Sequence, residues 1–326
     1  MVGGISTIQI PGPAAAMNRT NTTPAQEVPS ATPPAQVRAA LLTIQVLFGI
    51  NYLASKVIVT AMPPAAWAVL RTSGAFLVLA VVALAGKRRL PGSRDIGLLA
   101  VCALFGVVFN QGFFLEGLSR TTVGRSALIC SQIPTFVLLF SVIARQESLT
   151  LRTGLGFFAG VAGVLVLLGV DRFTLDHRYL AGDLLTLINA TSYALFVVLS
   201  RRVMARNDPL AATAVVFFFG ALGMMIYGGP SLLKTDFSVI TPGLFWVMIY
   251  VILGATVVTY FLNLWAVKRV QATRVALYIF LQPVIASVLG VAFRGEDITA
   301  RFVIATALVF AALMLRDSSA GIDSRK

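Results

Sequence analysis

The chain has 326 residues, of which 57% are hydrophobic and 12% are charged, and its mean hydropathy is +0.86. Soluble domains carry about 25% charged residues, so this composition excludes an ordinary soluble enzyme, a secreted domain and a disordered protein. The net charge of +13 comes from basic residues that lie singly or in short runs between apolar blocks. This placement is typical of topology signals and lipid contacts, and it argues against nucleic acid as a partner.

A tail precedes the apolar part of the chain. Residues 1–37 are rich in Pro, Thr, Ala and Ser and cannot bury enough surface to offset their ordering entropy, so we expect disorder. Ten apolar blocks of about 20 residues follow, each long enough for a helix to cross a bilayer. They span residues 39–60, 65–86, 96–115, 124–144, 153–170, 182–204, 210–228, 243–265, 273–293 and 299–315. The pattern predicts an all-α integral membrane protein with ten transmembrane helices and a cytoplasmic C-terminal tail at 317–326.

The basic residues predict the orientation of these helices. If the N-terminus lies inside, the cytoplasmic segments hold 17 Lys and Arg residues and the outer loops hold seven. Cytoplasmic loops of membrane proteins are enriched in Lys and Arg. We therefore expect both termini to be cytoplasmic, in a protein of the bacterial inner membrane. The short loops leave no room for an inserted soluble domain.

An internal repeat divides the apolar part into two halves. When residues 125–152 are aligned with 274–301 at a constant offset of 149, nine of 28 positions are identical, where chance gives about two or three. The alignment predicts two repeats of five helices, at 38–172 and 178–316. Because five is odd, corresponding helices cross the membrane in opposite directions. Such inverted repeats are typical of alternating-access transporters, with a substrate site between the halves.

Several motifs, in their order along the chain, resemble EamA-like members of the drug/metabolite transporter superfamily. They are Phe48-Gly-Ile-Asn51-Tyr-Leu-Ala-Ser-Lys56 with Leu70-Arg71, Gly182-Asp183 leading to Ser200-Arg201-Arg202, and the paired Pro134…Glu147-Ser-Leu-Thr150 and Pro283…Glu296-Asp-Ile-Thr299. The resemblance covers about 38–316. It implies ten helices in two inverted repeats around a central cavity, and transport of amino acids or other small metabolites, often outward. Members commonly carry Trp where this chain has Phe48 and Tyr193.

Two basic residues lie within predicted helices, where charge is costly. Lys56 and Arg71 each lie within about 6–9 Å of the outer interface, close enough for their head groups to reach it. Glu116 lies at the outer end of its helix and is a partner for either. We expect a structural ion cluster at the outer mouth, with an outer gate or a carboxylate-docking site as the alternatives. Arg201, the repeat counterpart of Lys56, suits a symmetry-related inner gate.

No Asp or Glu lies near the middle of a predicted helix. Proton-driven carriers usually keep an ionisable carboxylate at that depth. The nearest candidates, Glu116 and Asp183, are both at helix ends. This favours facilitated diffusion or exchange over tight proton coupling.

Uncharged polar side chains within the helices are the predicted substrate-binding residues, because each needs a partner in the protein or in a wet cavity. They are Asn51, Ser55, Asn110, Gln111, Ser131, Gln132, Asn189, Tyr193, Tyr260, Asn263, Tyr278 and Gln282. The alternative for any one of them is an interhelical hydrogen bond.

Proline and small residues predict local helix geometry. Pro134 and Pro283 stand near the middle of two repeat-related helices, and each removes an amide donor, which predicts kinks beside the binding region or kinks that serve only packing. Gly156-x-x-x-Gly160 and Ala307-x-x-x-Ala311 allow close helix approach. Intramolecular packing and a homodimer contact are both open for these motifs.

A membrane-embedded enzyme that acts on lipid-linked substrates is the alternative from another class. Such an enzyme needs acid–base or metal groups. The chain has one histidine, His177, and two separated cysteines, Cys102 and Cys130. They form no metal-ligand cluster and no His-dependent triad, so we predict no catalytic residue, metal or cofactor.

The expected function is therefore secondary transport. We expect export or exchange of amino acids or related small metabolites by alternating access, with a small-molecule substrate and the lipid bilayer as partners. Import or facilitated diffusion of another small solute, such as a sugar, a purine or a cationic drug, is the alternative within this class.

Overall fold

The computed structural model describes residues 33–121, 123–146, 151–168, 177–282, 284–285, 303–304 and 307–308. Most of the predicted N-terminal tail, the C-terminal tail, Pro283 and the Glu147 and Glu296 turns lie outside the described residues. Within them, every element is helical. The elements are α1 (Ala35–Ala61), α2 (Pro64–Ala85), α3 (Ser93–Ala103), η1 (Leu104–Phe109), α4 (Asn110–Arg120), α5 (Val123–Cys130), α6 (Ile133–Ile143), α7 (Leu151–Leu168), α8 (His177–Met204), α9 (Pro209–Leu233), η3 (Phe237–Val239), α10 (Pro242–Ile252), η4 (Leu253–Val258), α11 (Thr259–Val267), α12 (Ala272–Leu277) and η5 (Tyr278–Phe280).

The first eight predicted apolar blocks each fall on helical segments, so the all-helical prediction is confirmed for this part of the chain. The ninth block is described through α12, η5 and a few following residues, and the tenth only at 303–304 and 307–308. The count of ten helices therefore stays a prediction.

Six segments are long and apolar enough to cross a membrane, judged by length and composition. Four lie within the single helices α1, α2, α8 and α9. The other two are composite, because Ser93–Arg120 joins α3, η1 and α4, and Pro242–Val267 joins α10, η4 and α11. α6 is a shorter apolar helix.

The two composite helices are interrupted at matching places. η1 and η4 are π-helical, and each lies between two α-helical parts. The two π segments begin and end 149 residues apart, as do α3 and α10, which is the offset of the internal sequence repeat. A π turn widens the helix and is often found at functional sites. The same irregularity thus recurs at the offset of 149 residues that aligns 125–152 with 274–301.

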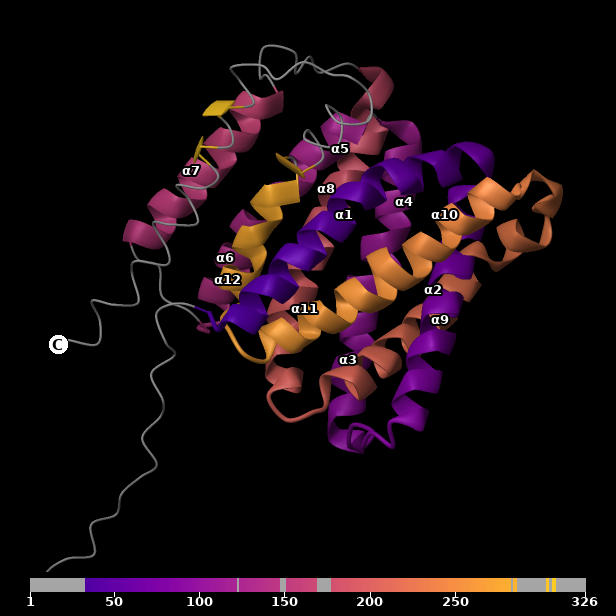
Figure 1. Cartoon of the computed structure of the whole chain (residues 1–326), viewed down its shortest axis with the longest axis horizontal. Helices are drawn as coiled ribbons and strands as arrows, with labels where there is room; N and C mark the ends of the chain where they lie inside the picture. Colours follow the sequence, from indigo (N-terminus) through magenta and orange to yellow (C-terminus); the bar gives the residue numbers. More distant parts are fainter. Residues whose placement is uncertain are drawn as a thin grey trace, which may run out of the picture.

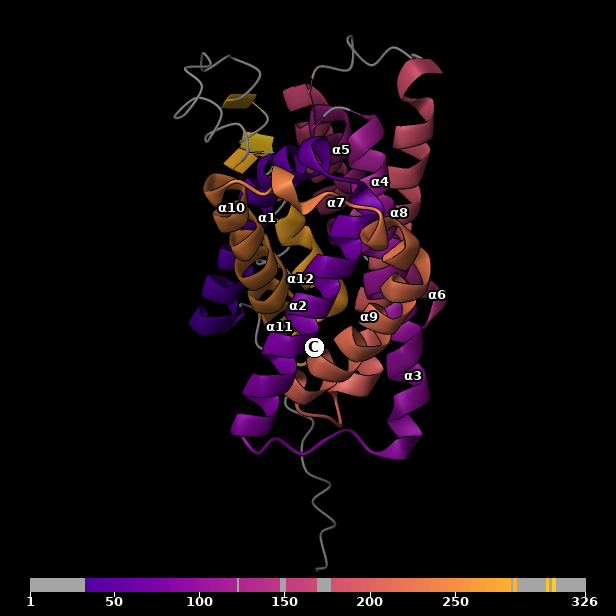
Figure 2. The same cartoon turned by 90° about the vertical axis from the view of Figure 1, so that its right-hand side faces the viewer.

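Contacts between the two halves of the chain hold the bundle together. The most extensive helix pair is α2 with α9, followed by α4 with α8. Figure 1 shows α10 and α11 as one tilted rod beside α1, with α2 and α9 together and α7 at the edge of the bundle. In the perpendicular view of Figure 2, α3 and α8 lie on one side and α10 on the other. The interior is filled by large apolar side chains, among them the fully buried Trp67, Phe196 and Phe217.

The predicted helix at 124–144 is split in two. α5 ends at Cys130, a turn follows at Ser131 and Gln132, and α6 begins at Ile133. Pro134 therefore stands in the first turn of α6, where an amide donor is not needed, because the first four amides of a helix have no intrahelical acceptor. The position predicted as a kink is a break and restart of the helix.

Glycine allows the closest approach in the α2–α9 pair. A Cβ atom at Gly228 would collide with the backbone carbonyl oxygen of Ala65, which cannot move aside as a flexible side chain can. We expect Gly228→Ala to lower the free energy of unfolding by about 1–3 kcal/mol, the usual cost of overpacking. The measurement is the unfolding temperature of the purified protein in detergent.

Gly97→Ala in α3 is the matched control, because a Cβ atom there would meet no other atom within 4 Å. It should leave stability unchanged or raise it slightly, since Ala favours helix over Gly. Equal unfolding temperatures for the two variants would contradict the proposed close packing.

Candidate functional site

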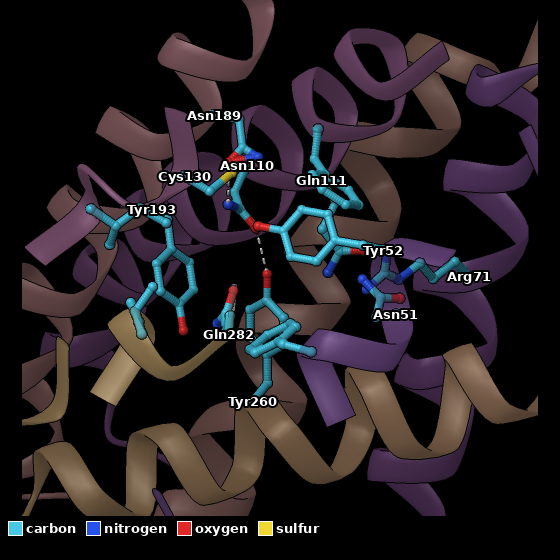
Figure 3. Close-up of a pocket in the computed structure, with 14 residues that line it drawn as sticks. Asn51, Tyr52, Arg71, Asn110, Gln111, Cys130, Asn189, Tyr193, Tyr260 and Gln282 are labelled. Carbon is cyan, nitrogen blue, oxygen red and sulfur yellow. Dashed lines mark hydrogen bonds between the residues drawn. The ribbon is translucent and has the colours of Figure 1, made fainter. Parts of the chain in front are cut away.

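A cavity lies inside the bundle between helices from both halves of the chain, and it encloses about 490 Å³ of empty space, part of it open to solvent. α1, α2, α4, α5 and α6 contribute lining residues from the first half, and α8, α11, η5 and Gln282 contribute them from the second. The lining consists of Phe48, Asn51, Tyr52, Arg71, Asn110, Gln111, Phe114, Cys130, Ile133, Asn189, Tyr193, Tyr260, Ile279 and Gln282. Figure 3 shows Arg71 and Asn51 at one end of this cavity and Tyr193 at the other.

Arg71 is the one charged residue of this lining, and only 2% of it is exposed. Its Nε donates to the Thr256 hydroxyl at 2.8 Å, and its Nη2 lies 3.4 Å from the carbonyl oxygen of Ala255. Both partners belong to η4. The remaining guanidinium nitrogen, Nη1, has no hydrogen-bond partner. The π segment thus holds one side of the guanidinium and leaves the other side unsatisfied.

Tyr260 occupies the corresponding place against η1. Its hydroxyl lies 2.6 Å from the carbonyl oxygen of Gly106 and 2.8 Å from Oδ1 of Asn110, and Nδ2 of Asn110 lies 3.4 Å from Oδ1 of Asn189. The ring packs edge-on against Phe217, with a centroid distance of 4.9 Å. This chain of polar groups connects α4, α8 and α11 across the cavity wall.

Seven of the twelve predicted substrate-binding residues line the cavity. They are Asn51, Asn110, Gln111, Asn189, Tyr193, Tyr260 and Gln282. Their role in binding stays a prediction, but the structure brings them together from the four helices α1, α4, α8 and α11 and from Gln282, just after η5.

The other five predicted residues lie behind or beside the lining. Ser55 donates to Oδ1 of Asn51 at 2.9 Å, and Nδ2 of Asn263 donates to the Tyr193 hydroxyl at 2.8 Å. These two residues orient lining side chains without lining the cavity themselves. Ser131 and Tyr278 are buried, and Gln132 is half-buried at the α5–α6 break.

The predicted ion cluster is not formed. Lys56 donates to the carbonyl oxygens of Leu118 and Thr121, at the C-terminal end of α4, where a positive charge meets unpaired helix carbonyls. Glu116 instead pairs with Arg120 at 2.5 Å and accepts a hydrogen bond from Tyr227 at 2.8 Å.

The partners explain why Glu116 and Arg71 stay apart. Glu116 lies in a second hollow between α4, α8 and α9, outside the cavity. Arg71 points into the bundle towards η4 and away from the interface. Arg201 is half-buried in the last turn of α8.

Sequence reasoning missed Tyr52 and Cys130 as lining residues. Both side chains are buried, and the Tyr52 ring packs edge-on against Phe114 at a centroid distance of 5.6 Å. The position of Tyr52 beside Asn51 in the middle of α1 was a usable signal. Among the described residues, no three His, Cys, Asp or Glu side chains come together in a way that would hold a metal ion.

The Tyr260 hydroxyl should be important for stability. We expect Tyr260→Phe to reduce the free energy of unfolding by about 0.6–2 kcal/mol, because it removes a buried hydroxyl that hydrogen-bonds the Gly106 carbonyl and the Asn110 amide in a low-dielectric interior. Tyr227→Phe, which removes an exposed hydroxyl bonded to Glu116, is the control and should cost less. Thermal unfolding of both variants in detergent tests this, and an equal loss in the two would argue against a special role for Tyr260.

Comparison with known proteins shows which family this chain resembles. The EamA-like transporter family matches residues 39–169 and 180–316, which together make up most of the chain. Two Bacillus subtilis relatives named uncharacterized transporters, YvbV and YoaV, are 28% and 21% identical, over 86% and 84% of this chain and 92% and 94% of their own lengths. The WAT1-related protein At3g02690, chloroplastic, of Arabidopsis thaliana is 25% identical over 85% of this chain and 68% of its own length.

A solved crystal structure has the same fold, with a TM-score of 0.69 over 86% of this chain and 96% of that one, at 21% sequence identity. The resemblance seen in the motifs is confirmed. The family and the six long apolar helices support an integral membrane protein with the small-molecule substrate of a transporter. The chain belongs to the EamA-like transporter family.

Proposed function

We propose that this protein is a secondary transporter that exports or exchanges amino acids or related small metabolites by alternating access. The observation that supports this best is the cavity itself, whose polar and aromatic lining comes from both halves of the chain. Polar side chains in the interior of a membrane protein are costly unless they serve a substrate or water, and carriers usually bind between repeats.

Alternating access requires two halves that can move against each other. The proposed halves are the repeats at 38–172 and 178–316, with both termini in the cytoplasm and the protein in the bacterial inner membrane. The matching π segments η1 and η4 support the repeat. So do the contacts of α4 with α8 and of α1 with α11, because the repeat alignment exchanges these two pairs. A rocking movement between related halves would then expose the cavity to each side in turn.

Transport can be measured by counterflow in liposomes that contain only the purified protein. Loaded amino acids are tested singly for trans-stimulated tracer uptake, and we expect saturable exchange of a subset. Asn189→Leu keeps the side-chain size but removes an amide from the cavity wall, so exchange should fall by about two- to tenfold. Thr213→Val is the control, because this buried hydroxyl bonds only the carbonyl of Pro209 within α9.

If Asn189→Leu exchanged amino acids as fast as the Thr213→Val control, the proposal that this cavity binds the substrate would be contradicted. No exchange of any amino acid by folded protein would remove the amino-acid assignment and lead to sugars, purines and cationic drugs as the next solutes.

We expect exchange to be independent of a proton gradient. The cavity lining has no carboxylate, and Glu116 is held outside it by Arg120 and Tyr227. A pH gradient imposed on the same liposomes should therefore not drive accumulation, and Glu116→Gln should exchange at the rate of the unaltered protein. Accumulation that follows the gradient and disappears in Glu116→Gln would show proton coupling through this residue.

A further inference from the structure

The cavity contains a buried guanidinium without a counter-charge. Arg71 is 2% exposed, and a side chain of this type stays protonated in proteins. Removing such a charge from water costs several kcal/mol unless an opposite charge and hydrogen bonds replace the water. Arg71 has two neutral partners in η4 and one nitrogen, Nη1, with none.

The described residues provide no carboxylate for Arg71. Their ion pairs lie elsewhere, between Arg88 and Asp208, Arg120 and Glu116, and Arg206 and Asp95. The guanidinium is also fixed in place, because the Thr256 hydroxyl that accepts from Nε itself donates to the carbonyl oxygen of Val251 at 2.7 Å. Arg71 thus provides a rigid, partnerless donor in the lining of the cavity, which is what a bound anion requires.

The remaining lining is neutral. Around the cavity stand amides and aromatic rings, and no acidic side chain is present to pair with an ammonium group. Oδ1 of Asn51 accepts from Ser55, and Oδ1 of Asn189 accepts from Asn110, so the NH2 groups of both amides are left for the cavity. The amide oxygens of Gln111 and Gln282 remain as acceptors, but these two NH2 groups, Nη1 of Arg71 and the amide nitrogen of Gln111 outnumber them, and such donors suit an anion.

The single positive charge sets the charge of the ligand. One cation compensates one negative charge, so a phosphate monoester with two charges would be undercompensated in this site. A zwitterion would bring an ammonium group that has only neutral acceptors. A carboxylate on an apolar or aromatic body fits both the charge and the rings of Phe48, Tyr52 and Phe114.

We propose that Arg71 binds the carboxylate of a monoanionic solute with an apolar or aromatic body, and that the site does not require a free ammonium group. The inference rests on the proposed transport function and narrows it. Among metabolites related to amino acids, it selects N-acylated or deaminated carboxylates over the free amino acids.

Three probes with the same ring separate the two charges of an amino acid. N-acetylphenylalanine has the carboxylate alone, phenylalanine amide has the ammonium alone, and phenylalanine has both. Binding of each is measured by isothermal titration calorimetry and thermal shift with the detergent-solubilised protein, and the leucine series and phenylacetate are added to vary the body. N-acetylated acids should bind more tightly than the free amino acids, and the amides should not bind.

Arg71→Gln should weaken binding of the carboxylates about ten- to a hundredfold, the range expected for charge-assisted hydrogen bonds. Arg269→Gln is the matched control, because it removes the same charge from an exposed side chain that stacks on Trp265. Size-exclusion profiles report whether Arg71→Gln is folded, and the comparison among the three probes needs no variant at all.

Each outcome decides. Equal affinity for acid and amide, unchanged affinity in a folded Arg71→Gln, or no binding by any of the carboxylates would overturn the carboxylate site. The proposed transport function fails separately: binding that depends on Arg71, without counterflow of any bound probe, would remove transport and leave the site. Counterflow of phenylalanine amide that is unaffected by Arg71→Gln would remove the carboxylate site and leave the transport function.

Discussion

Inside a bilayer, every backbone carbonyl and amide must find a partner within the protein, and this demand shapes both the helices and the cavity. Two segments of the chain, η1 and η4, depart from the regular α-helical ladder. Side chains hydrogen-bond backbone carbonyls of both segments. Tyr260 reaches the Gly106 carbonyl, while Arg71 and Thr259 reach that of Ala255. The lining of the cavity is thus also part of the backbone hydrogen bonding of the two composite helices.

This dual role explains why polar groups are concentrated where they are. A polar side chain in the hydrocarbon region costs free energy, and the cost falls when it satisfies a backbone group. Asn110 and Asn189 extend the set from Tyr260 across to α8. Ser55 and Asn263 then fix Asn51 and Tyr193 from behind. These polar side chains, which come from both halves of the chain, therefore meet at one cavity, where neighbouring side chains hold them in place.

The fold was largely predictable from sequence because hydropathy reports burial in lipid directly. The first eight apolar blocks fell on helices, and the EamA-like family was recognised from motif order. The site was harder. A polar residue within a helix predicts that its side chain needs a polar environment. The rotation of the helix then decides whether the side chain faces a cavity, as for Asn51, or a neighbouring side chain, as for Asn263. The same role in an ion cluster is predicted for Lys56 and Arg71, but their surroundings differ. Lys56 donates to carbonyl oxygens at the end of α4, whereas Arg71 is buried and donates to η4. No hydropathy pattern indicates a π turn.

Some residues of the cavity wall hydrogen-bond the backbone and others only line the cavity, and this difference limits how substrate selectivity can change during evolution. Replacing Tyr260 or Arg71 alters backbone hydrogen bonding as well as chemistry, so such changes carry a folding penalty. Phe48, Ile133 and Ile279 line the same cavity with hydrocarbon alone, and their size can vary without the loss of a hydrogen bond to a backbone carbonyl. Paralogues with new solute preferences would therefore be expected to diverge first at these apolar positions, and to keep the polar lining as an inherited scaffold.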